Sequence, residues 1–434
     1  MTKQEVLQLS DQAIKSAEDY IMNLGKTIWA NPETGYRETQ TADLLVGELE
    51  KLGFEVKTGL AVTGFRADLD TGKPGPTIAI MGELDALLIP SHPEAVNGAA
   101  HSCGHNTSAA ALIGSAIGLK AAVQSGELCG KIAFIGTPAE EGIELEYRQS
   151  LVDAGKIGSI AGKPQLIREG VLDDVDIAYM HHLSRRFGYN SHNGSVCKKI
   201  IFKGKSCHAA APENGINALN GMNLALHALG LLRESYSSSD KVRFHGIVSN
   251  GGQAVNIIPD NVEMDYMLRA ETIEKLVSLN DRFDNAVTHA ALAAECDVEI
   301  RTVPYSMPLD DDVMLGEEMR KVVNALFPGE EFNANGFFLS SCTDMGDVAT
   351  VIPSVHGYVP GAIGASHSKD YYVNNYYTGC VYPALINARV AIELLSNNAE
   401  KGKVIAARKA NLMPIPEYIK LLDSLASTKT VSAK

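Results

Sequence analysis

The chain has 434 residues, of which 45% are hydrophobic and 21% are charged, and its formal net charge at pH 7 is −14. This composition is typical of a globular protein large enough for two domains with their own cores. The negative charge and the lack of a Lys/Arg cluster argue against a nucleic-acid partner. No apolar run is long enough for a membrane span and no signal-peptide core follows the polar residues 1–5, so we expect a cytoplasmic protein without a membrane partner.

The first part of the chain alternates helical and strand patterns. Residues 6–24 have the apolar spacing of an amphipathic helix, and a second helix is expected to end near residue 52. The alanine-rich segment 107–122 predicts a third helix, capped by one of the polar residues 106–108. Short apolar runs predict buried strands at 77–81, 131–135 and 176–180.

Polar side chains follow each of these three predicted strands. In open α/β sheets, ligands collect outside the carboxyl ends of the strands, so we expect these side chains to share one crevice. Two adjacent glutamates on a loop can point in different directions, so that one binds a metal and the other acts as a general base; the alternative is a solvated acidic loop. The three pairs are Glu83 and Asp85, Glu140 and Glu141, and His181 and His182.

A single glycine separates Cys103 from His105, just ahead of the alanine-rich helix. Together with the acids and histidines elsewhere, and with His367 in a turn of small residues, this pair predicts a metal site. The alternative is a thiol nucleophile, Cys103, with His105 as its base, but adjacent C-x-H geometry suits metal binding better. His101 is a candidate for a position beside the ligands. The seven cysteines are scattered and odd in number, which does not indicate a disulfide framework.

From about residue 194 the pattern changes to βαββαβ, which predicts an inserted ferredoxin-like domain. His208, Asn256 and Arg269 lie in or beside turns of this segment and are candidate donors to a substrate carboxylate or to an oxyanion. After residue 304 the chain returns to helices and ends in a polar tail that we expect to be frayed. The predicted domains are a catalytic domain in two parts, 1–190 and 306–434, and a lid or dimerisation domain at 191–305.

Four motifs, in their order along the chain, resemble the amidohydrolase branch, subfamily D, of the M20 metallopeptidase clan. The resemblance covers nearly the whole chain and is greatest to the subgroup that contains the p-aminobenzoyl-glutamate hydrolase B subunit and related dipeptidases. The motifs are Gly-Glu-Leu-Asp-Ala-Leu at 82–87, Cys-Gly-His-Asn at 103–106, Gly-Lys-Ser-Cys-His-Ala-Ala at 204–210 and Thr-Asp-Met-Gly-Asp-Val at 343–348.

The resemblance implies an α/β fold with a mixed-sheet, zinc-peptidase-like catalytic domain and a ferredoxin-like lid that forms a homodimer. It also implies two divalent metal ions, Mn²⁺ or Zn²⁺ with Co²⁺ as a further candidate, with Glu140 as general base, Asp85 as a supporting acid and His208 as a lid residue that reaches the other protomer's site. His182 is preferred to His181 because the Leu-Ser that follows it matches the family's ligand context. The implied metal ligands are Cys103, His105, Glu141, His182 and His367.

The predicted function is a binuclear metal-dependent amidohydrolase that cleaves the amide of an N-acyl or N-aminoacyl amino acid. A dipeptidase of the same family and a non-catalytic binding protein on this fold are the alternatives. The sequence departs from the closest subgroup in four places, none of which removes a ligand, so the substrate itself stays open. These are the longer segments 88–100 and 143–163, His-His-Leu-Ser at 181–184 and Ser-Cys-Thr-Asp at 341–344.

Overall fold

The computed structural model describes residues 1–237, 239–334 and 338–433, which form two compact units. Unit 2 interrupts unit 1 in the chain. The units divide the chain at other positions than the predicted domains, because residues 306–309, 339–346 and 416–434 of the predicted second catalytic part lie in unit 2. Unit 1 comprises Met1–Ser191, Asp310–Phe338 and Asp347–Ile415, and unit 2 comprises His192–Leu309, Leu339–Gly346 and Pro416–Lys434.

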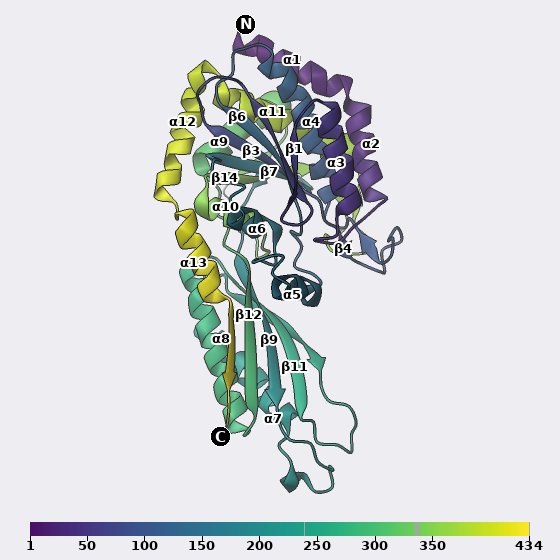
Figure 1. The fold of residues 1–434 in the computed structure, drawn as a ribbon, viewed down its shortest axis with the longest axis vertical. Coiled ribbons are helices and arrows are strands. Elements are labelled where there is room, and N and C mark those ends of the chain that lie inside the picture. Colours follow the sequence, from purple (N-terminus) through teal and green to yellow (C-terminus); the bar gives the residue numbers. More distant parts are fainter. Residues whose placement is uncertain (238, 335–337, 434) are drawn as a thin grey trace. The chain divides into compact units, whose positions relative to one another are not determined.

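Unit 1 is built on a mixed sheet (Figure 1) with the strand order β1 (Val56–Leu60), β2 (Gly64–Asp70), β6 (Lys131–Thr137), β3 (Thr77–Glu83), β7 (Ile177–Ser184), β14 (Ser354–Pro360), β8 (Phe187–Tyr189) and β13 (Phe332–Ala334). The central strands β6, β3, β7 and β14 run parallel, so their carboxyl ends lie at one edge of the sheet. All seven residues of β3 are buried, as expected of a strand covered on both faces. Two short hairpins pair β4 (Leu87–Leu88) with β5 (Ala99–Ala100) and β15 (Ala362–Ile363) with β16 (Tyr372–Val373).

Helix α4 (His105–Val123) packs against β3, β6 and β7 and is itself covered by α1 (Lys3–Ser16), α2 (Glu18–Trp29) and α11 (Tyr382–Leu395) (Figure 1). Small residues allow this close packing: a Cβ on Gly118 would lie 2.6 Å from Cδ1 of Ile14 in α1. The remaining helices placed wholly or mainly in unit 1 are α3 (Thr39–Lys51), α5 (Leu145–Asp153), α6 (Gly162–Arg168), α9 (Val313–Leu326), α10 (Met345–Val351) and α12 (Glu400–Ala406).

Two predicted helix boundaries are wrong. The segment 6–24 forms two helices rather than one, because the chain breaks at Ala17 between α1 and α2. Helix α4 begins at His105, so residues 106–108 lie in its first turn instead of capping it. The N-cap is Gly104, whose φ of 94° is in the left-handed region that favours glycine. This turn brings Cys103 and His105, on either side of the glycine, to the start of the helix.

Unit 2 has the predicted βαββαβ order and a ferredoxin-like sheet, which confirms this part of the fold. Its helices α7 (Ala218–Leu232) and α8 (Ile273–Ala293) pack on each other and on the sheet, where their apolar side chains form the core of the unit. The sheet is antiparallel, in the order β10 (Arg243–Asn250), β11 (Asn261–Ala270), β9 (Gly194–Lys203), β12 (Asp297–Ser306) and β17 (Ser427–Val431).

The expectation of a frayed C-terminal tail is wrong. After α13 (Ile415–Leu425), β17 pairs with β12 and adds a fifth strand to the sheet. Lys429 in β17 lies opposite Ile300, and its Nζ is 2.7 Å from Oδ2 of Asp284 in α8. The open edge of β12 supplies the backbone partners that a short polar strand needs.

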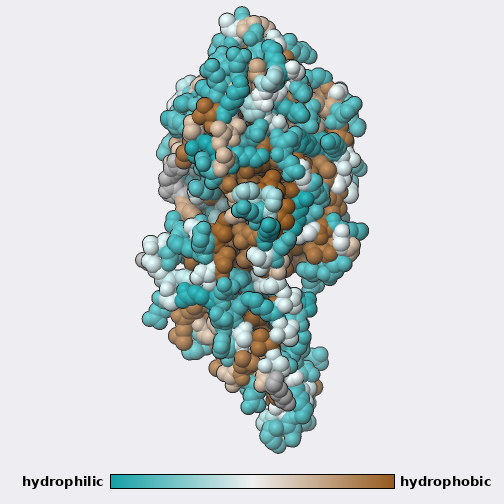
Figure 2. All heavy atoms as spheres, turned by 60° about the vertical axis from the view of Figure 1, so that its left-hand side comes forward, coloured by the Kyte–Doolittle hydropathy of each residue, from teal (hydrophilic) through white to brown (hydrophobic). Residues whose placement is uncertain are grey.

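The surface mixes hydrophilic and hydrophobic residues (Figure 2). Hydrophilic residues cover much of the face in Figure 2, with separate hydrophobic patches between them. Within the described parts of the chain, none of the helices combines the length and the apolar character that crossing a lipid bilayer requires.

Candidate metal centre

The side chains that follow β3 and β6, together with those near the end of β7 and the start of α4, meet in unit 1. Their ligand atoms form three overlapping groups, and within each group the atoms lie within 4.8 Å of one another. Cys103 belongs to two of these groups and His105 to two, so the groups form one continuous cluster. The groups are Cys103, His105 and His182; Cys103, Glu141 and His367; and Glu83, His105 and Glu140.

His182 faces this cluster and His181 does not. Sγ of Cys103 lies 3.2 Å from Nε2 of His182, whose Nδ1 is 2.8 Å from the carbonyl oxygen of Leu183. Nδ1 of His181 is instead 2.7 Å from Oδ1 of Asn387 in α11. Successive side chains of a strand point to opposite faces, which separates the two histidines of β7.

Asp85 connects two of the candidate ligands. Its Oδ1 lies 3.1 Å from Nδ1 of His105, and its Oδ2 accepts a hydrogen bond of 2.9 Å from the backbone N–H of Glu141. The carbonyl oxygen of Asp85 is also 2.9 Å from the same Nδ1. These acceptors favour the tautomer of His105 that carries its proton on Nδ1 and leaves Nε2 with a lone pair toward the cluster.

The turn after β6 points its two glutamates in different directions. Oε1 of Glu141 lies 3.3 Å from Nε2 of His367, and Oε2 of Glu140 lies 3.9 Å from Nε2 of His105. Ala139, just before them, has a φ of 53°, and its N–H donates to the buried carboxylate of Glu38 over 2.8 Å. A non-glycine residue held in this conformation is often found where a functional group must be aimed.

His367 is the most exposed member of the cluster. Its side chain is 52% exposed, whereas that of Glu141 is 6% exposed. The residue has a φ of 62°, and its N–H donates to the carbonyl oxygen of Ser102 over 2.9 Å, which fixes the turn beside the Cys103 motif.

The long segment 88–100 is tied to the same motif. It forms the β4–β5 hairpin, and Nδ1 of His92 accepts from the N–H of Glu94, so Nε2 donates to the carbonyl oxygen of Tyr371 over 3.0 Å. The hydroxyl of Tyr371 in turn donates to the carbonyl oxygen of Cys103 over 3.0 Å. Two hydrogen bonds thus connect this hairpin with the turn that carries Cys103.

Burial and neighbouring charges shift the pKa values of three candidate ligands. Burial raises the pKa of the Cys103 thiol, but the imidazoles of His182 and His105 outweigh burial and hold that pKa well below its usual value. Burial lowers the pKa of His367, but Cys103 and Glu141 raise it to about 11. Burial raises the pKa of Glu141 to about 7.

The cluster fits divalent cations. Nε2 of His105, Oε1 of Glu141 and Oε2 of Glu83 are buried and have no hydrogen-bond partner among the residues that the structure describes. Buried polar atoms are rarely left in this state unless an ion or water satisfies them. One thiolate, three imidazoles and carboxylates form a donor set that binds Zn²⁺, Mn²⁺ or Co²⁺.

Sequence reasoning missed two residues of this region. Glu83 was noted at the end of its strand but given no role, and Lys163 in α6 was not considered. Nζ of Lys163 lies 2.7 Å from Oε1 of Glu83, and both side chains are buried. The place of Glu83 at the end of a buried strand could have indicated a role in the site. No sequence pattern indicates that it pairs with a lysine 80 positions away.

The three candidate residues of unit 2 are not together. The N–H of Ala209, next to His208, donates to the carbonyl oxygen of Asn256 over 3.0 Å, so these two loops are neighbours. Arg269 lies near the far end of β11, opposite Ser195. At about 3.3 Å per residue, β11 separates it from these loops by roughly 25 Å.

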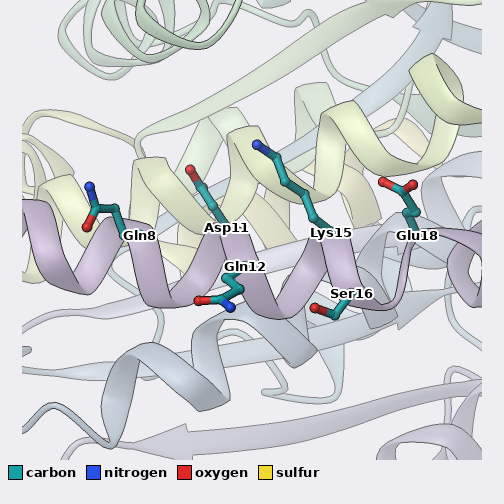
Figure 3. Close-up of a pocket in the computed structure, with 6 residues that line it drawn as sticks. All are labelled: Gln8, Asp11, Gln12, Lys15, Ser16 and Glu18. Carbon is teal, nitrogen blue, oxygen red and sulfur yellow. The ribbon is translucent and has the colours of Figure 1, made fainter.

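A depression of about 450 Å³ lies away from the cluster, along α1. Figure 3 shows Asp11 and Lys15 pointing to the same side of α1. Asp11 already binds Arg389 of α11 through Oδ1 over 3.0 Å. No candidate ligand lines this depression, whose residues are Gln8, Asp11, Gln12, Lys15, Ser16 and Glu18.

Comparisons with known proteins show what the chain is similar to. Residues 190–305 match the family model of the peptidase dimerisation domain. The chain is 30% identical to the Xaa-Arg dipeptidase of Mus musculus over 384 residues, which cover 83% of this chain and 81% of that protein. It is 32% identical to the B subunit of p-aminobenzoyl-glutamate hydrolase from Escherichia coli over 313 residues, which cover 69% of this chain and 60% of that protein.

The fold is similar to that of a dinuclear metal-binding peptidase of the M20 family from Bacillus subtilis. The TM-score is 0.68 at 20% sequence identity, and the match covers 88% of this chain and 99% of that chain. The sequence motifs, the two-unit fold and the extent of identity to the mouse dipeptidase lead to one conclusion: the chain belongs to the M20 family of metallopeptidases and amidohydrolases, and it is an enzyme that hydrolyses amide bonds.

Proposed function

We propose that this enzyme cleaves the amide of an N-acyl or N-aminoacyl amino acid with two metal ions. The observation that carries the proposal is the shared position of Cys103 between two groups of ligand atoms, with Glu140 beside them. The names of the two relatives support the substrate class, since an Xaa-Arg dipeptide and p-aminobenzoyl-glutamate are both amides of an amino acid. Similarity to the mouse Xaa-Arg dipeptidase favours a dipeptide as the substrate.

The ligands would divide between two ions that share the Cys103 thiolate. Glu141 and His367 would hold one ion, and His105 and His182 the other. Mn²⁺ and Zn²⁺ are the candidate ions, with Co²⁺ as a third, because all three accept imidazole and carboxylate ligands. When bound, such ions lower the pKa of a coordinated water toward neutrality and polarise the amide carbonyl.

Glu140 is proposed as the general base. Glu140 lies beside the ligands, whereas its neighbour Glu141 faces His367 as a candidate ligand. Glu140 is therefore the glutamate of this turn that would take the proton of the attacking water. The same carboxylic acid would then protonate the leaving amine. Asp85 would keep His105 in the tautomer that binds through Nε2.

His208 and Asn256 are proposed as donors to the oxyanion and to the substrate carboxylate, because their loops are neighbours in unit 2. Arg269, at the far end of β11, would not act with them on one small substrate within one protomer. We further propose a homodimer formed through unit 2, in which His208 acts in the partner's site; the match to a dimerisation domain supports this.

A reducing compartment, the cytoplasm, is the proposed location. The seven cysteines are free thiols, and Cys103 can bind a metal only while it stays reduced.

The test combines metal removal with a change of the base. Protein stripped with EDTA and reloaded with Mn²⁺, Zn²⁺ or Co²⁺ is assayed on N-acyl amino acids, aminobenzoyl-glutamate and dipeptides. We expect hydrolysis only with metal, and a loss of at least about 100-fold in kcat for Glu140→Gln. Glu50→Gln, on the exposed face of α3, is the matched control.

Two results would count against the proposal. If two ions bind and none of these amides is hydrolysed, the substrate class is wrong. If activity survives EDTA while Cys103→Ser abolishes it, the enzyme uses the thiol as a nucleophile instead.

A further inference from the structure

Glu83 and Lys163 form a buried ion pair next to the metal centre. Their side chains are 1% and 0% exposed, and Nζ of Lys163 lies 2.7 Å from Oε1 of Glu83. Two charges removed from water in this way add little stability on their own, because desolvation offsets their attraction. The position of the second carboxylate oxygen shows what else the pair does.

Oε2 of Glu83 points away from Lys163 and toward His105. It lies 3.2 Å from Nε2 of His105, and both atoms are buried without a hydrogen-bond partner in the described part of the chain. Because Asp85 occupies Nδ1 of His105, Nε2 is the ring nitrogen that faces this oxygen. Two buried polar atoms this close together form a place for a cation, which is either a proton on His105 or a metal ion bound by both side chains.

The separation suits two ligands of one ion. With bonds of about 2.1 Å to nitrogen and oxygen, two ligand atoms on the same ion lie roughly 3.0–3.4 Å apart. Glu83 and His105 also share a group of ligand atoms with Glu140. One carboxylate oxygen of Glu83 thus binds the lysine, and the other faces His105.

We propose that Glu83 is a further ligand of the ion held by His105, and that Lys163 is the counter-ion that keeps this carboxylate oriented. This inference rests on the two-metal site proposed above and adds a hard oxygen donor to its thiolate and imidazoles. A carboxylate shifts the preference of a site toward Mn²⁺ relative to a site of sulfur and nitrogen alone. Lys163 offsets the extra negative charge that the added carboxylate brings.

Metal affinity tests the proposal without relying on activity. Zn²⁺ and Mn²⁺ are titrated calorimetrically into the metal-free full-length protein, and bound metal is counted after dialysis. For Glu83→Gln we expect one of the two ions to bind at least about tenfold more weakly, with the larger loss for Mn²⁺. For Lys163→Met we expect the affinity for the same ion to fall by about 10–100-fold.

A second buried lysine provides the matched control. Nζ of Lys198 in unit 2 lies 2.5 Å from Oδ1 of Asp284 and 2.6 Å from the hydroxyl of Thr302. Lys198→Met removes the buried one of the two lysine partners of Asp284, the other being Lys429, and we expect it to lower stability while both metal affinities stay unchanged. A similar metal loss in this variant would mean that general destabilisation, and not ligation, explains the effect.

Direct observation decides the matter even if a variant does not fold. In a crystal structure of the metal-loaded wild-type enzyme, anomalous scattering locates the ions, and we expect Oε2 of Glu83 at about 2–2.4 Å from one of them. A distance above about 3 Å, or unchanged affinity in a folded Glu83→Gln variant, overturns this inference alone. Failure of the wild type to bind two ions would overturn the proposed function as well.

Discussion

Asp85 holds His105 from the side opposite to the metal ligands, with Oδ1 3.1 Å from Nδ1 of the imidazole. The other oxygen of the same carboxylate binds the N–H of Glu141, so one side chain orients ligands from two separate segments of the chain. The consequence is that the ligand geometry is set by a residue that need not touch an ion.

Asp85→Asn should therefore weaken metal binding although every ligand is retained. An amide cannot accept from both groups with equal strength, so either His105 or the Glu141 loop loses its orientation. We expect metal affinity and kcat/KM to fall by about 10–100-fold. Calorimetric titration and steady-state kinetics measure this, with Asp43→Asn on the exposed surface of α3 as control. Unchanged metal affinity would show that Asp85 does not act through the ligands.

The adjacent histidines of β7 should have separable effects. His182→Ala removes a side chain that contacts Cys103, so we expect loss of bound metal and of activity. His181→Ala breaks the hydrogen bond to Asn387 in a buried position, so we expect two ions to remain but stability to fall by about 1–3 kcal/mol. Metal analysis and urea denaturation distinguish the two variants. The reverse pattern would make His181 the ligand.

Metal binding at pH 7 should release protons. The pKa of His367 is raised to about 11, so its imidazole is protonated in the metal-free protein, and Glu141, with a pKa of about 7, is partly protonated. Both must lose protons to bind a cation, so affinity should fall as the pH is lowered. Calorimetry in buffers of different ionisation enthalpy counts the released protons. A binding heat that does not depend on the buffer would contradict this expectation.

Glu38 should make the stability of the metal-free protein depend on pH. Burial and the nearby Asp85 raise its pKa from 4.5 to about 7, so the folded state favours the neutral acid. Its stabilising contribution is fully present below about pH 4.5 and is lost as the pH rises through about 7. In Glu38→Gln we expect a difference on the order of 1–3 kcal/mol between these limits to disappear. Urea denaturation in EDTA from pH 4.5 to 8 measures it, and an equal pH dependence in both proteins would exclude this role.

The fold and the ligand cluster could be predicted from the sequence because both depend on local patterns. The parallel strands β3, β6 and β7 are visible as apolar runs, and the polar residues after β3 and β6 and near the end of β7 must meet where their carboxyl ends meet. The two histidines of β7 could not be separated in this way, because their orientation depends on which face of the strand meets α11. The pair of Glu83 with Lys163 depends on how α6 packs, which no local pattern records.

The C-terminal strand has a consequence for how unit 2 is made. Residues 427–431 of β17 pair with residues 298–302 of β12, so more than a hundred residues of unit 1 and α13 are synthesised between the two strands. During translation, the backbone groups at this edge of β12 stay unpaired with β17 until residue 431 has left the ribosome. A strand left open in this way can pair with another chain, so folding in the cell should be most prone to aggregation in that interval.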